Sequence, residues 1–361
     1  MQSMFFVELI IVLACLYIGT RFGGIVFGLI SGVGLAILVF GFGLTPGTPP
    51  TDVLYIILAA VTCAGTFQAA GGMSYLTQLA EKLLRRHPQY ITFLAPLCTF
   101  FLTVLVGTGH VVYTLMPIIV DIAIKNNVRP ERPCAVASVA SQLGIMASPI
   151  AAAVVAFSLI SSQNGFEITI PQILMVSLPS ALTGLLCAAT LSMKRGKDLD
   201  KDKAFQQFIS DPAHREFVYN SSESCLDKQI GKKEKISTFI LLGAILSIVI
   251  LAACGYKAVK MNVVIQIIML VAAFLMVVLC KVKASEIAKS NVWRSGMVAV
   301  IVIYGVAWMA DTLFSNYMGV FKEAFDEQKA AISALDALRD GVQVGKTVKI
   351  DDAGKEALQP L

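Results

Sequence analysis

Charged residues are scarce in this chain, and their scarcity limits the class of protein. Only 15% of the 361 residues are Asp, Glu, Lys or Arg, whereas 56% are hydrophobic. A soluble domain carries about a quarter charged residues. The apolar residues also gather into long runs, and about 20 apolar residues in a helix cross a bilayer. The composition therefore predicts an all-α polytopic membrane protein surrounded by lipid.

Several motifs of enzyme chemistry are also missing. The sequence has no HExxH zinc motif, no GxSxG nucleophile elbow and no phosphate-binding P-loop. Its eight cysteines stand singly, which favours small core residues over metal ligands or disulfides. No basic patch with interleaved aromatic residues suggests nucleic acid. We therefore expect a protein that is not an enzyme, with no catalytic residues, no metal, no cofactor and no nucleic-acid partner.

The apolar segments and the basic loops between them predict an orientation. The segments lie at about 4–20, 24–42, 52–70, 90–106, 110–124, 135–160, 172–193, 237–255, 262–280 and 296–315. The first lacks the basic start and the cleavage site of a signal peptide, so we expect it to span the membrane. Lys and Arg gather in loops 81–87, 125–132, 194–235 and 281–294, but not in 43–51 or 161–171. Because basic loops stay in the cytoplasm, the N-terminus is predicted to be periplasmic.

The long charged loop 194–235 suggests a boundary between two halves. Residues 1–193 would form the first transmembrane half, and residues 236–319 would begin the second. Residues 320–361 read as a polar C-terminal tail without an apolar run long enough to span a membrane.

Segment 90–125 has basic loops at both ends and a glycine-rich centre. Its two apolar legs meet at Gly107, Thr108, Gly109 and His110, so the segment is either two short spans or a re-entrant hairpin. Glycines permit a tight reversal, and the second leg would start there with free N–H groups that suit a carboxylate. We expect Thr108 to cap this helix. His110 is either a buried, hydrogen-bonded histidine or a titratable substrate contact.

The next segment, 134–160, is predicted to be a broken helix. Pro149 lacks an N–H and clashes with the carbonyl of Ile145, so the helix should break or kink there. Ser141, Gln142 and Ser148 lie just before the break. Small polar residues of this kind serve close helix packing, but discontinuous helices also build substrate sites in secondary transporters.

Two acidic residues allow alternative interpretations. Asp311, near the end of segment 296–315, is either interfacial or a residue that couples an ion to transport. Asp121 lies one helical turn before Lys125, which predicts a solvated ion pair.

Long stretches of the sequence resemble the Dcu carriers for anaerobic C4-dicarboxylates, and the DcuB-type branch is the nearer one. The resemblance covers residues 1 to about 325, and its most specific stretches are GTGHVVYTLMPIIVDIAIKNNVRPERP, SQLGIMASP, RGKDLDKDKAFQQFIS and VWRSGMVAVIVIYGVAWMADT. It implies a bacterial inner-membrane antiporter that exchanges fumarate, malate or aspartate for succinate in anaerobic respiration.

The resemblance also implies a fold and a site. The fold would be an inverted-repeat secondary transporter, each repeat with a re-entrant hairpin (here 90–125) and a broken helix (here 134–160). By position, the substrate-binding residues would be Gly107, Thr108, Gly109, His110, Ser141, Gln142, Ser148 and Pro149, with Asp311 as the coupling candidate.

The tail departs from this pattern, because the family continues with a second hairpin and a second broken helix where this sequence becomes polar. The alternative interpretation is therefore a truncated, non-transporting membrane protein, or a partner of a dicarboxylate sensor such as a membrane sensor kinase. Further copies of the same chain are also expected partners, in a homo-oligomer.

Overall fold

The computed structural model describes residues 2–151, 153–154, 157–158, 161, 166, 168–220, 226, 229–255, 258–341, 346–350 and 356–360. Eight helices within these ranges are long and apolar enough to cross a membrane. This confirms an all-α polytopic membrane protein. The chain forms two compact units, one of Met1–Pro49 with Ile301–Leu361 (unit 1) and one of Pro50–Val300 (unit 2).

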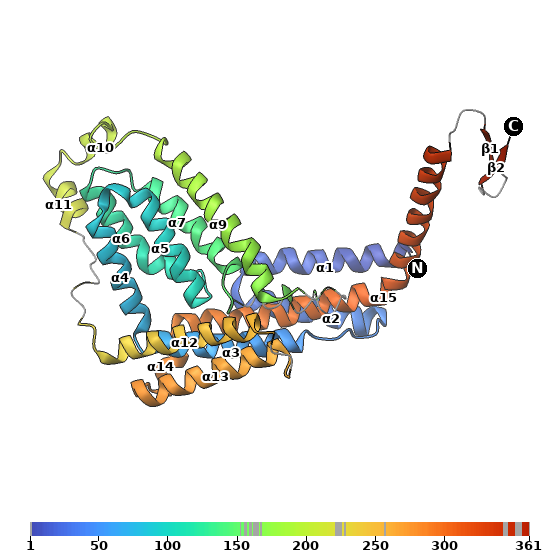
Figure 1. Ribbon diagram of the computed structural model, residues 1–361, viewed down its shortest axis with the longest axis horizontal. Coiled ribbons are helices and arrows are strands. Elements are labelled where there is room, and N and C mark those ends of the chain that lie inside the picture. The colour runs from blue at the N-terminus through green and yellow to red at the C-terminus, as the bar shows by residue number, and fades with distance from the viewer. Residues whose placement is uncertain are drawn as a thin grey trace. The chain divides into compact units, whose positions relative to one another are not determined.

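Unit 1 begins with a helical hairpin. α1 (Gln2–Phe22) and α2 (Gly24–Ala36) are joined at Gly23, and a π-helical turn, η1 (Ile37–Gly41), extends α2 (Figure 1). Gly23 and Gly24 both have positive φ, of 66° and 54°, a conformation that glycine adopts without steric cost. The rest of unit 1 consists of the larger part of α15 (Asn291–Gly341) and an antiparallel pair of strands, β1 (Lys346–Ile350) and β2 (Glu356–Pro360).

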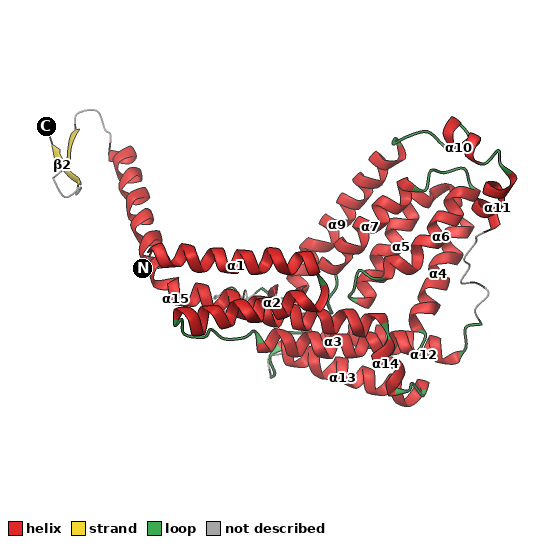
Figure 2. Ribbon diagram, turned by 180° about the vertical axis from the view of Figure 1, so that it is seen from behind, coloured by secondary structure: helices red, strands yellow, loops and turns green. Residues whose placement is uncertain are grey.

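Unit 2 is built from helices in its described residues (Figure 2). Helices α5, α6 and α7 pack against one another, and α9 packs against α5 and α7. α3, α12 and α13 form a second group, which α4 joins to the first through its contacts with α6 and α12. The elements are α3 (Thr51–Ala69), α4 (Gly72–Arg86), η2 (Pro88–Tyr90), α5 (Ile91–Val106), α6 (Val111–Lys125), α7 (Glu131–Met146), α9 (Ile170–Met193), α10 (Lys203–Phe208), α11 (Pro212–Asn220), α12 (Lys232–Ala253), α13 (Met261–Cys280) and α14 (Ala284–Lys289).

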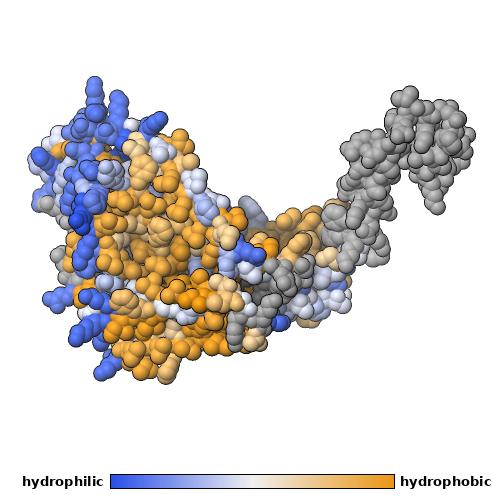
Figure 3. Space-filling model, viewed as in Figure 1, coloured by the Kyte–Doolittle hydropathy of each residue, from blue (hydrophilic) through white to orange (hydrophobic). Residues whose placement is uncertain are grey.

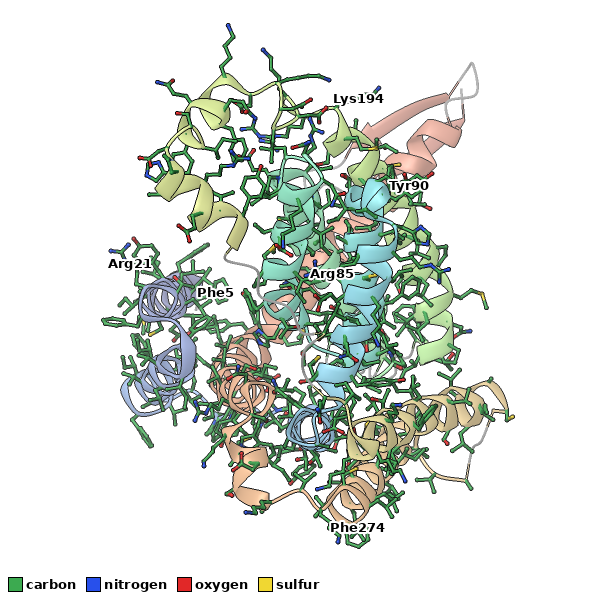
Figure 4. The ribbon with its side chains drawn as sticks, turned by 90° about the vertical axis from the view of Figure 1, so that its left-hand side faces the viewer. Phe5, Arg21, Arg85, Tyr90, Lys194 and Phe274 are labelled. Carbon is green, nitrogen blue, oxygen red and sulfur yellow. The ribbon has the colours of Figure 1, made fainter. Side chains whose placement is uncertain are left out.

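The surface of unit 2 matches a bilayer environment. Large apolar side chains are exposed on its helices, among them Met175 at 75% and Phe274 at 65%. Hydrophobic residues cover the middle of the unit, whereas hydrophilic residues gather at the end that carries α10 and α11 (Figure 3). Tyr90, before α5, and Lys194, after α9, both lie at that end (Figure 4). The chain segments before α5 and after α9, which were predicted to be basic loops, therefore lie at the same polar end of the unit.

One element departs from the prediction. Residues 81–87 were expected to be a basic loop, but Gly72–Arg86 form the amphipathic helix α4. Its buried face includes Met73, Leu76, Ala80 and Leu84. These apolar residues recur at helical spacing among polar ones, a pattern of a surface helix rather than of a span.

Candidate functional site

The hairpin tip is a four-residue turn between α5 and α6. α5 ends at Val106, and the N–H of Gly107 donates to the carbonyl of Thr103 at 2.7 Å. Gly107 has a φ of 76°, the left-handed conformation in which helices commonly end. α6 begins four residues later, at Val111. The sequence-based position of the reversal, Gly107–His110, is therefore the position that the structure gives.

Thr108 does not cap α6, contrary to the prediction. The N-cap is His110, which is itself helical (φ −66°, ψ −13°) and has no side-chain cap. Thr108 lies too early in the turn to reach the first N–H groups of α6, and its buried Oγ1 has no hydrogen-bond partner. Among the described residues, no group accepts from the N–H groups of Thr108, Gly109, His110 and Val111. These donors are available to a ligand.

His110 is exposed, so its alternative as a buried, hydrogen-bonded histidine is wrong. Its ring stacks against that of Tyr113, with 5.9 Å between the centroids. No hydrogen bond from its ring to another described group is present.

The predicted break in the segment 134–160 lies at Ala147–Ala151. α7 ends at Met146, and helical residues resume at Ala153. The N–H of Ala151 donates to the carbonyl of Ser148 at 3.3 Å, which is a turn and not a helical bond. Pro149 has no N–H, and the N–H of Ile150 reaches no described acceptor. The proline thus ends α7 as the sequence predicts.

The hairpin tip and the break lie against each other. A Cβ on Gly107 would come within 2.9 Å of Ile150 Cγ1, just after the break. A Cβ on Gly109 would come within 3.0 Å of Gln142 Nε2 and 3.4 Å of the Ser141 carbonyl, just before it. The Ser148 hydroxyl donates to the carbonyl of Val104, near the end of α5, at 2.7 Å. Six of the eight predicted substrate-binding residues thus take part in this junction: Gly107, Gly109, Ser141, Gln142, Ser148 and Pro149.

The polar groups at the junction differ in exposure. Ser141 is fully buried, and its hydroxyl donates to the carbonyl of Ser138 at 2.7 Å. Gln142 is exposed, and its amide makes only a long contact of 3.4 Å with Ser141 Oγ. The sequence holds no Lys or Arg between Ile91 and Ile124, or between Pro133 and Gly165. An anion here would therefore be met by N–H groups, an amide and a helix N-terminus instead of a full positive charge.

Asp311 lies in unit 1 and is exposed on α15. Its Oδ2 accepts a hydrogen bond from the N–H of Thr48 at 2.8 Å. In the adjacent turn, the N–H of Gly47 donates to Thr312 Oγ1 at 3.0 Å. The carbonyl of Gly47 accepts a hydrogen bond from Trp308 Nε1 at 2.7 Å. Asp311 thus helps to fasten the loop that follows η1 onto α15, and its coupling role stays a prediction.

Comparison with known proteins gives the family. The model of the DcuA_DcuB family, described as anaerobic C4-dicarboxylate membrane transporters, matches residues 4–338. The chain belongs to the DcuA_DcuB family. Because this family consists of C4-dicarboxylate transporters, the chain is a multi-pass membrane transporter and not an enzyme.

Relatives within the DcuA_DcuB family align with most of the chain. The anaerobic C4-dicarboxylate transporter DcuB of Escherichia coli O6:H1 is 44% identical over 372 residues, covering 99% of this chain and 82% of the relative. The C4-dicarboxylate transporter DcuA of Helicobacter pylori J99 is 38% identical, covering 88% and 72%. That of Wolinella succinogenes is 35% identical, covering 87% and 73%. No solved structure matches the chain.

The DcuA_DcuB chain also contains a buried charge network that the sequence analysis missed. Asp121 was expected to form a solvated pair with Lys125, but its side chain is only 7% exposed and accepts from two cations. Lys125 Nζ lies 2.7 Å from Asp121 Oδ1, and Arg85 Nη2 lies 3.0 Å from Oδ2. Arg85 also binds the buried Glu81 at 2.8 Å. Burial lowers the pKa of Arg85, but the two carboxylates outweigh it and raise that pKa overall.

A second network fastens the loop 195–202 to the first turn of α7 and to the turn before it. Arg132 donates to Asp198 at 2.7 Å, to the carbonyl of Arg195 at 2.7 Å and to that of Gly196 at 2.9 Å. Arg129 binds both Asp202 and the exposed Glu131, and its hydrogen bond holds the pKa of Glu131 below the usual range. Except for the Arg129–Glu131 pair, the partners lie more than sixty positions apart in the sequence, so no local spacing could have paired them.

Proposed function

We propose that this transporter is an antiporter of the bacterial inner membrane that exchanges fumarate, malate or aspartate for succinate in anaerobic respiration. The observation that carries the proposal is the contact between the glycine tip of the α5–α6 hairpin and the break after α7. Unpaired N–H groups on both sides of this contact suit a ligand with two carboxylates, and the family membership supplies the C4-dicarboxylate class.

In this proposal the tip binds one carboxylate of the substrate. The donors are the N–H groups of Thr108–Val111, at the positive end of the α6 dipole. The buried Thr108 hydroxyl, which has no partner, and the exposed His110 ring lie on the same turn. They are the side chains on this turn that can contact the bound anion.

The break binds the other carboxylate. The N–H of Ile150 is the backbone donor there, and the exposed Gln142 amide is the side-chain donor. The hydroxyls of Ser141 and Ser148 are engaged with carbonyls and can still accept. Pro149 contributes by ending α7, so that the polar backbone of the break is exposed to the ligand.

The proposal places the hairpin tip within the membrane. The loops at both ends of 90–125 are basic, which favours a re-entrant hairpin with both ends in the cytoplasm. Irregular backbone at membrane depth must be buried in protein or face a wet cavity. The contact with α7 covers part of the tip, and the exposed His110 requires the rest of the tip to face a wet cavity. We further propose that residues 1–193 and 236–319 correspond to the two repeats of an inverted-repeat carrier.

The test is an exchange assay with the purified 361-residue chain in liposomes. Vesicles are loaded with radiolabelled succinate, and efflux is followed after fumarate is added outside. We expect efflux to accelerate several-fold over buffer alone. A chain that is folded and inserted but shows no acceleration would contradict the proposal.

Variants then test the site. Gln142→Ala should raise the KM for external fumarate about tenfold, since a lost hydrogen bond to a charged group costs about 1.5 kcal/mol. Ser138→Ala, an exposed serine one turn earlier on α7, is the matched control and should leave KM within twofold. The combined variant His110→Ala, Ser141→Ala, Gln142→Ala should lose succinate–fumarate exchange. Unchanged exchange kinetics in this variant would show that the hairpin tip and the break do not bind the substrate.

A further inference from the structure

Unit 1 holds a carboxyl group inside a membrane-spanning helix. Glu8 belongs to the candidate span Met4–Phe22 of α1, about 6 Å along the axis from its start at 1.5 Å per residue. The residue is only 2% exposed. Acidic residues at such positions are rare, because a bilayer offers no water to an ionised group, and they commonly serve a function.

The described buried cluster of unit 1 contains apolar side chains and one tyrosine. Val12, Leu313 and Tyr317 belong to the buried cluster of this unit, and the rings of Phe5 and Tyr317 lie 4.9 Å apart. Phe5 is labelled on α1 in Figure 4. The Tyr317 hydroxyl is hydrogen-bonded to the Glu8 carboxyl. The second carboxyl oxygen, Oε2, is buried and has no hydrogen-bond partner.

No cation neutralises this carboxyl within the described residues. None of the ion pairs found there includes Glu8. α2 and η1, which follow α1, contain no Asp, Glu, Lys, Arg, His, Tyr or Cys, and neither does the loop 42–50. On α1 the buried Cys15 lies two turns further along. The titratable groups of the described α15 side chains in this unit are Tyr304, Asp311 and Tyr317, and Asp311 is bound to Thr48.

A carboxylate in this position would be a buried charge with a single hydrogen bond. An ionised carboxylate has about four acceptor sites, and its burial without a countercharge is strongly unfavourable. Protonation removes the charge and leaves a neutral acid that still hydrogen-bonds to Tyr317. Two oxygens are too few for a metal ion, which requires at least four ligands in typical sites. The chemistry of the site therefore selects a proton as its ligand.

We propose that Glu8 and Tyr317 form a buried proton-binding site in the membrane-spanning part of unit 1. The site is independent of the proposed exchange function, because it depends only on contacts within unit 1.

Infrared spectroscopy of the full chain in lipid tests this proposal. At pH 7 the wild type should show the C=O stretching band of a protonated carboxylic acid, and Glu8→Gln should lose it. Tyr317→Phe should keep the band but move it to the frequency of a carboxyl without that hydrogen bond. Glu286→Gln is the matched control, since Glu286 is 53% exposed and lies 3.7 Å from Lys289, and it should leave the band unchanged.

A band that persists at full intensity in Glu8→Gln, or that is absent from the wild type, would overturn the proposal. Should Glu8→Gln fail to fold, solid-state NMR of the wild type labelled with carboxyl-13C glutamate replaces it. At least one glutamate should then show the shift of a neutral acid at pH 7, and carboxylate shifts for all of them would be decisive against a bound proton.

Discussion

Gly107 is the residue at which the hairpin depends most directly on the absence of a side chain. Its φ of 76° costs an L-residue roughly 1–2 kcal/mol. A Cβ would also stand 2.9 Å from Ile150 Cγ1, so the tip and the break would have to separate. We predict that Gly107→Ala lowers the succinate–fumarate exchange rate more than tenfold. Gly184→Ala, on α9 with open space around it, is the control and should retain the wild-type rate.

Ser148 connects the break to the hairpin through one hydrogen bond. Its hydroxyl donates to the Val104 carbonyl, which lies in the last turn of α5, where carbonyls lack helical partners. Ser148→Ala leaves this partly buried carbonyl unpaired and should lower the free energy of unfolding by about 1 kcal/mol, at the lower end of the cost of an unsatisfied group. Thermal unfolding in detergent measures the loss. Ser180→Ala removes an exposed hydroxyl that bonds only within α9, and an equal loss there would show that the Val104 contact is not the cause.

At the scale of elements, the buried carboxylate of Asp121 ties α6 to α4. It accepts from Arg85 of α4 and from Lys125 of its own helix. Asp121→Asn leaves a partly buried Arg85 with a single carboxylate partner, and we expect a loss of about 1–3 kcal/mol in stability, at the lower end because Arg85 is 27% exposed.

Hydrogen exchange locates this effect. Amide protection in α4 and α6 should fall in Asp121→Asn, whereas Asp200→Asn, in the exposed part of the charged loop, should change neither helix. A fall confined to the loop 195–202 would mean that the network does not join these two helices.

The elements that sequence reasoning found are those with a local cause. Long apolar runs give the spans, Gly107 gives the reversal, and Pro149 ends α7, all through forces acting within one or two turns. α4 was missed because its apolar residues lie among polar ones and form no long run. The cap assigned to Thr108 was wrong because the tip has two more residues before α6 begins. Arg85–Asp121 and Arg132–Asp198 depend on tertiary packing, and Glu8 is unusual only once its surroundings are known.

At the scale of the whole molecule, the distribution of Lys and Arg predicts which loops face the cytoplasm. The loop 43–51 has no basic residue, whereas ten lie in 194–235: Lys194, Arg195, Lys197, Lys201, Lys203, Arg215, Lys228, Lys232, Lys233 and Lys235. Because cytoplasmic loops retain basic residues, the first loop should be periplasmic and the second cytoplasmic. Pro46 and Lys197 are exposed positions at which the two loops can be labelled.

Cysteine labelling in intact cells decides the orientation. In a variant without the eight native cysteines, Pro46→Cys should react with a membrane-impermeant maleimide from outside. Lys197→Cys should react only after the inner membrane is permeabilised, and labelling both positions in permeabilised cells controls for accessibility. The reverse pattern would place the N-terminus and loop 43–51 in the cytoplasm. The α5–α6 hairpin would then enter the membrane from the periplasm, and its basic ends would oppose the charge rule on which the re-entrant assignment rests.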